Sequence, residues 1–219
     1  IKELNETRQS TVSTQDVAQM TQRLTTLECV SRLSPFSIPS LERGIAALME
    51  WTGTTQTTVV FDSALHPFNA ENVFRRLCNR ANVAVVASSR EGDVFGGFYS
   101  PPLKHIDRSM SELKDPSAFL FSFESRGRCA TPQRFPVAEE RQCRVFFDRG
   151  SPSGFIRFSV DVTTSEIFFG NEQSDSFCQS LSNGFNGLED TTLTGTTRTT
   201  SRGPFHRCVR LIAIQLSTP

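Results

Sequence analysis

The clearest hydrophobic pattern in this 219-residue chain is a pair of apolar runs separated by a polar turn. Residues 83–87 are apolar on both alternating faces, which is typical of a strand buried on two sides. Residues 89–92 end in glycine, which indicates a hairpin turn. The second run, residues 93–99, contains Gly96 and Gly97, and glycines inside a strand mark close approaches to the backbone. The pattern predicts a buried hairpin in which aromatic rings lie across the glycines.

Further apolar runs predict a protein made mostly of strands. Alternating or continuous apolar residues predict strands over residues 57–61, 117–123, 145–148, 155–160, 167–169 and 207–216. Strands and helices do not alternate regularly, which argues against a parallel sheet. We therefore predict an α+β fold, in which an antiparallel β-sandwich is flanked by helices.

Two helices are predicted from apolar residues at helical spacing that follow a capping residue. Ser40 begins one helix and Asn69 begins the other. We further expect a short helix over residues 109–114 and a helical turn over residues 176–181. Loops are expected over residues 125–140 and 191–203.

The first part of the chain is predicted to be a helical extension, residues 1–34, followed by one domain over residues 35–219. Val17, Met20, Leu24 and Leu27 follow the spacing of a coiled-coil seam. The seam covers only two heptads, so two structures stay open: homo-oligomerisation through residues 10–30, and packing of the helix on its own domain. The chain opens without Met, as expected of a fragment or a processed form.

The amino-acid composition makes some classes of function less favoured than others. Lys and Arg total 23 and equal Asp and Glu in number, so the net charge is zero. Nucleic-acid binders usually carry a basic excess, which makes binding through an Arg patch the least favoured alternative. No apolar stretch approaches the length of a membrane span. The 19 Phe residues have no polar tip and are expected to fill the core.

The second alternative function is that of a redox-protective enzyme that uses a cysteine. The six cysteines stand at positions 29, 78, 129, 143, 178 and 208. Their spacing fits no zinc site, and without a secretory signal we expect reduced thiols and a cytoplasmic location. None of the three His residues is fixed as a base beside a cysteine. Asp62, Glu91 and Asp93 could supply carboxylates, but Glu91 and Asp93 flank a turn, where such residues are ordinarily exposed.

A family resemblance comes from the order of several segments. They are Trp51, residues 57–61, the helix over 69–78, Val83-Ala84-Val85-Val86, Asp93-Val94-Phe95-Gly96-Gly97-Phe98, Phe119-Leu120-Phe121, Gly154-Phe155-Ile156-Arg157-Phe158 and Arg210-Leu211-Ile212-Ala213-Ile214-Gln215-Leu216. Together they resemble the TLDc domain. The resemblance implies a β-sandwich with helices packed around it, protection against oxidative stress, and binding to the vacuolar proton pump (V-ATPase). It implies no agreed reaction or active site.

The chain departs from the family pattern at the closing strand and before the sixth strand. Ala213 and Gln215 stand where the family usually has Glu and Trp, and a glycine-rich run is reduced to Gly150 and Gly154. If the Glu takes part in partner binding, this chain binds a different partner.

The favoured function is a non-catalytic protein-interaction domain. No catalytic, cofactor-binding or metal-ligating residue is predicted. The structural motif is predicted to consist of Phe95, Gly96, Gly97, Phe98 and Gly154. Arginine is enriched at protein interfaces, so arginines are the candidate partner contacts. These are Arg75, Arg76, Arg80, Arg126, Arg128 and Arg134.

Overall fold

The computed structural model describes residues 39–104, 110–139, 141–148, 154–160, 165–170, 176–195, 205–206 and 208–218. The predicted helical extension, and with it the coiled-coil seam and the homo-oligomer through residues 10–30, lies outside the described residues.

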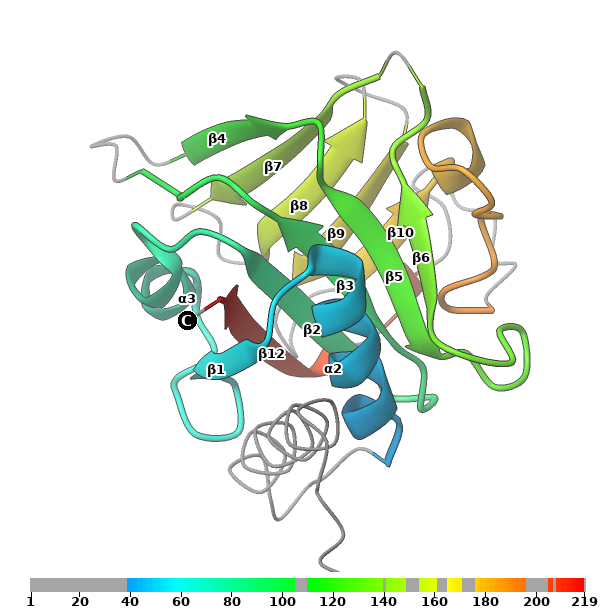
Figure 1. Ribbon diagram of the computed structural model, residues 1–219, viewed down its shortest axis with the longest axis horizontal. Coiled ribbons are helices and arrows are strands. Elements are labelled where there is room, and N and C mark those ends of the chain that lie inside the picture. Colours follow the sequence, from blue (N-terminus) through cyan, green and yellow to red (C-terminus); the bar gives the residue numbers. More distant parts are fainter. Residues whose placement is uncertain are drawn as a thin grey trace, which may run out of the picture.

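Within the described residues, two antiparallel sheets of six strands each form a sandwich (Figure 1). Sheet 1 has the strand order β1-β12-β2-β3-β5-β6. Its strands are β1 (Gln56–Asp62), β2 (Val83–Ser89), β3 (Val94–Tyr99), β5 (Phe119–Glu124), β6 (Gln133–Pro136) and β12 (Cys208–Ser217). Sheet 2 has the order β11-β10-β9-β8-β7-β4. Its strands are β4 (Met110–Asp115), β7 (Cys143–Asp148), β8 (Gly154–Val160), β9 (Ser165–Gly170), β10 (Ser176–Gln179) and β11 (Phe205–His206). The predicted α+β sandwich is confirmed for this part of the chain.

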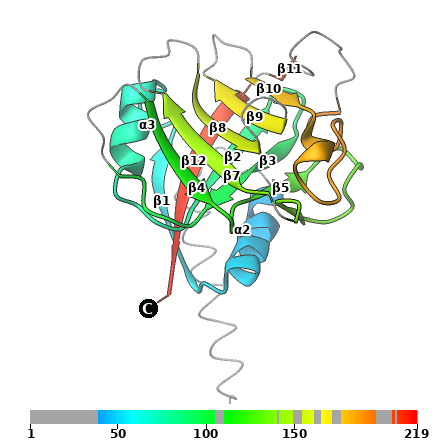
Figure 2. The same ribbon diagram turned by 90° about the horizontal axis from the view of Figure 1, so that it is seen from above.

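The helices cover one face and one end of the sandwich. The α2 helix (Pro39–Thr52) lies against the outer face of sheet 1, on the side away from sheet 2 (Figure 2). The α3 helix (Ala70–Leu77) lies beside β1. The predicted cap at Asn69 is confirmed, because its side chain accepts a hydrogen bond from Asn72 N at 3.0 Å. α2 begins at Pro39, one residue before the predicted cap Ser40.

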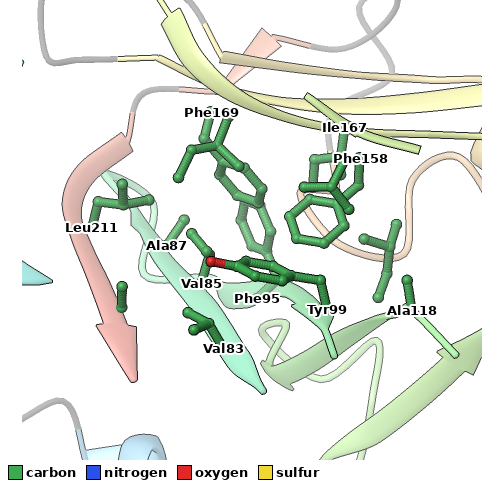
Figure 3. Packing of buried hydrophobic residues seen from close by; sticks show 14 of the residues in the cluster. Val83, Val85, Ala87, Phe95, Tyr99, Ala118, Phe158, Ile167, Phe169 and Leu211 are labelled. Atoms are coloured by element: carbon green, nitrogen blue, oxygen red, sulfur yellow. The ribbon is translucent and has the colours of Figure 1, made fainter. Parts of the chain in front are cut away.

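The centre of sheet 1 is buried on both faces, as the apolar run at residues 83–87 predicts. Val83, Val85 and Ala87 face sheet 2, whereas Ala84 and Val86 face α2. Between the sheets, aromatic rings from both sides fill the interior (Figure 3). The core rings on the sheet 1 side include Phe95 and Tyr99, and those on the sheet 2 side include Phe147, Phe158 and Phe169.

Two helical predictions are wrong. The segment expected to be a helix over residues 109–114 contains β4, which pairs with β7. Leu113 is buried while Glu112 and Lys114 are exposed, so the side chains follow the period of a strand. The helical turn expected over residues 176–181 is instead β10, which pairs with β9, and only its end leads into a 3₁₀ helix, η1 (Leu181–Asn183).

The loop prediction over residues 125–140 is wrong in part, because β6 lies within it. β6 is a short edge strand of sheet 1 that pairs with β5. Only Phe135 among its side chains is buried, so the strand offers almost no hydrophobic pattern.

Candidate interaction surface

The glycines of β3 allow rings to lie against both faces of the strand. A Cβ atom added at Gly97 would lie 2.7 Å from Phe158 Cζ in sheet 2. A Cβ atom at Gly96 would meet the Val85 carbonyl oxygen and the Phe121 ring. The flanking residues divide in the same way, since Phe95 faces sheet 2 and Phe98 faces α2. The geometry of this motif is that of packing.

Gly154, the last residue of the predicted structural motif, begins β8. It lies opposite Gly170 of β9, and the register shifts between Gly154 and Ile156. Such an irregularity changes the local twist of a strand. Gly154 lies on a different sheet from the β3 glycines.

Arg126 and Arg128, two of the predicted partner contacts, bind a buried carboxylate. Asp93 is 0% exposed and accepts from Arg126 Nε at 3.2 Å and from Arg128 Nη2 at 2.7 Å. The same two guanidinium groups donate to the backbone carbonyls of three successive residues, Thr192, Leu193 and Thr194. The expectation of an exposed Asp93 is therefore wrong. This cluster joins three segments of the chain: the β2–β3 turn, the loop before β6 and residues 192–194.

A second buried ion pair joins β1 to β12. Arg210 Nη2 lies 2.7 Å from Asp62 Oδ2, and Arg210 Nε donates to Asp62 Oδ1 at 3.1 Å. The Asp62 side chain is 0% exposed and that of Arg210 is 9% exposed. The bidentate geometry satisfies both carboxylate oxygens and fixes the relative position of the two strands.

The remaining arginine contacts lie at opposite edges of sheet 1. Arg134 lies on β6, where its guanidinium carbon is 4.4 Å from the centroid of the Phe119 ring. Arg75 and Arg76 are in the last turn of α3, and Arg80 follows the helix. Figure 1 shows α3 at one end of the sandwich and β6 at the other. The six predicted contacts thus do not form one continuous surface.

The arginines near α3 make hydrogen bonds to neutral groups. Arg75 Nη2 donates to Asn72 Oδ1 at 2.8 Å. Arg80 Nε donates to the Arg76 carbonyl oxygen, and Arg80 Nη1 donates to Gln215 Oε1, each at 2.7 Å. The Gln215 side chain of β12 therefore holds Arg80 at the end of the sandwich.

The described cysteines are thiols, and most are in the core. Burial raises the pKa of the Cys143 thiol to about 12, with a further contribution from nearby Asp115. Burial also raises the pKa of Cys178. Cys129 and Cys208 are buried, and Cys78 is half-buried. Among the described residues, no three His, Cys, Asp or Glu side chains gather so that they could hold a metal ion.

Fold and buried contacts define a filled two-layer β-sandwich with helices on one face and one end. The family profile of the TLDc domain matches residues 34–201, about three quarters of the chain. The chain belongs to the TLDc domain family. A search among curated proteins found no match. β12 lies after the matched residues, yet it pairs with β1 and β2 and so is part of sheet 1. None of the described helices is long and apolar enough to cross a membrane.

Proposed function

We propose that this TLDc domain is a non-catalytic protein-interaction module of the cytoplasm. Its proposed partner is the V-ATPase, and its proposed role is protection against oxidative stress, as the family resemblance implies. The observation that carries the proposal is that two buried carboxylates are bound by arginines of the domain itself. Asp62 and Asp93 each bind arginine, and the interior between the sheets is filled with aromatic and aliphatic side chains.

The raised pKa values of Cys143 and Cys178 argue against a cysteine enzyme that uses either of these two thiols as its nucleophile. A cysteine nucleophile reacts as the thiolate. With its pKa raised to about 12, Cys143 is protonated at neutral pH, and burial acts on Cys178 in the same direction. These thiols behave as small apolar core residues.

The departures from the family pattern are compatible with partner binding. Ala213 is 0% exposed and faces the interior between the sheets. A change at this position alters the core and leaves the outer surface in place. Gln215 is half-buried beneath Arg80, to which it is hydrogen-bonded.

Retention of the V-ATPase on the immobilised full chain tests the proposal. Solubilised vacuolar membranes would be passed over the protein, and V-ATPase subunits are expected to be retained. A β-sandwich domain from another family, also of zero net charge, serves as control. Equal retention by the two proteins would contradict the proposed partner.

Peroxide resistance of cells that produce the protein tests its non-catalytic nature. A variant with all six cysteines changed to Ala, which places no hydroxyl group in the core, is expected to keep both the resistance and V-ATPase binding. Loss of resistance with binding intact would favour the cysteine enzyme instead.

A further inference from the structure

The structure brings a fourth cation to the three arginines near α3. The backbone of Leu103 forms an isolated parallel β-bridge with that of Cys78. Its carbonyl oxygen accepts from Asn79 N at 2.6 Å, and its own N–H donates to the Arg80 carbonyl oxygen at 3.3 Å. The backbone at Leu103 therefore runs along the end of α3, and Lys104 follows directly. We call Arg75, Arg76, Arg80 and Lys104 the α3 basic patch.

The α3 basic patch differs from the other arginines in its partners. Ion pairs within the described residues engage arginines elsewhere, namely Arg126, Arg128, Arg144, Arg157 and Arg210. The members of the patch make no ion pair there. Arg75 and Arg80 bond to neutral oxygens, and the buried Nε of Arg76 has no partner among the described residues. Glu71, in the first turn, is the one acidic residue of α3.

The helix itself accounts for only part of this arrangement. Cations in the last turn of a helix interact favourably with the negative end of its dipole, which explains Arg75 and Arg76. Arg80 lies beyond the helix and Lys104 comes from another segment. Arg75 and Lys104 are exposed, so a partner can reach them. In a chain of zero net charge, the patch is a local excess of positive charge.

We propose that the α3 basic patch binds an acidic peptide segment of the partner protein. The inference rests on the proposed function, which supplies a protein partner. Carboxylates form strong charge-assisted hydrogen bonds with guanidinium groups. The balanced overall charge favours an acidic peptide over nucleic acid, whose binders usually carry a basic excess.

Fluorescence anisotropy of a labelled poly-glutamate peptide with the full chain tests the inference. The patch variant carries Arg75→Glu and Lys104→Glu, both at exposed positions. The matched control carries Arg43→Glu and Arg90→Glu, which are also exposed and change the net charge equally. We expect the patch variant to bind about tenfold more weakly, and the control to stay within about twofold of the unchanged protein. Thermal melting checks that both variants fold.

Three results of the binding measurements on peptide and oligonucleotide would overturn the inference. They are absence of peptide binding by the unchanged protein, equal weakening in both variants, and binding of a single-stranded oligonucleotide as tight as that of the peptide. The V-ATPase retention experiment separates this inference from the proposed function. If both variants retain the pump equally, the patch is not the contact and the proposed function stands. If the unchanged protein retains no pump, the proposed function fails, while the peptide measurement still decides whether the patch binds acidic segments.

Discussion

At the residue scale, the absence of a side chain at Gly97 lets the Phe158 ring of sheet 2 lie directly against β3. The Phe158 ring occupies the space where a Cβ atom would lie. Because the ring is itself fully buried, it has little room to move away.

We expect Gly97→Val to destabilise the fold by ~1–3 kcal/mol, because the added methyl groups overpack the core. Urea denaturation measures the change in the free energy of unfolding. The same substitution in a Phe158→Leu background is expected to be less destabilising, since the smaller side chain leaves space. Equal effects in both backgrounds would show that Phe158 is not the obstacle.

The packing role of Gly96 and Gly97 could be predicted from the sequence, because the pattern that indicates it lies within one short segment. The buried ion pairs could not, because each carboxylate and its partner lie far apart in the chain. Asp93 binds arginines 33 and 35 residues later, and Asp62 binds an arginine 148 residues later. Nothing in the neighbouring sequence distinguishes such an Asp from an exposed one beside a turn. Lys104 was missed for the same reason, since only the fold places it beside α3.

At the scale of secondary-structure elements, the errors fell on short strands with polar side chains. β4 has the sequence Met-Ser-Glu-Leu-Lys-Asp, which includes good helix formers. Its pairing with β7 overrides that preference. β12, in contrast, is continuously apolar over Leu211–Ile214, and its burial on both faces could be predicted directly.

The two ion pairs between elements are expected to differ in their effect on stability. Asp62→Asn removes the carboxylate charge that Arg210 binds in a buried site, and we expect it to destabilise by ~3–5 kcal/mol. Asp93→Asn is expected to cost less, ~1–3 kcal/mol. The reason is that its partners Arg126 and Arg128 are 45% and 26% exposed, so water can solvate them. Urea denaturation of both variants gives the ranking, and a larger loss for Asp93→Asn would contradict it.

At the scale of the whole molecule, buried thiols make the free energy of unfolding depend on pH in the alkaline range. The pKa of Cys143 rises from 9.0 to about 12 on burial, so folding disfavours its thiolate. A group with a raised folded-state pKa contributes its full stabilisation below its unfolded value and loses it as the pH rises. Burial acts on Cys178 and Tyr99 in the same direction.

We therefore expect the urea midpoint to fall between about pH 9, the ordinary thiol pKa, and about pH 12. Cys143→Ala removes one of the titrating groups, so its midpoint is expected to fall less steeply over that window. A pH profile parallel to that of the unchanged protein would show that Cys143 does not contribute.

The place of β12 in sheet 1 has a consequence for how the protein is made. It is the sole strand neighbour of β1 within the described residues, and it separates β1 from β2. As the ribosome releases the chain, β1 emerges long before the strand that it needs. Long-range pairings of this kind form slowly. The nascent domain therefore exposes unpaired strand edges until synthesis has passed residue 217, and unpaired strand edges promote aggregation.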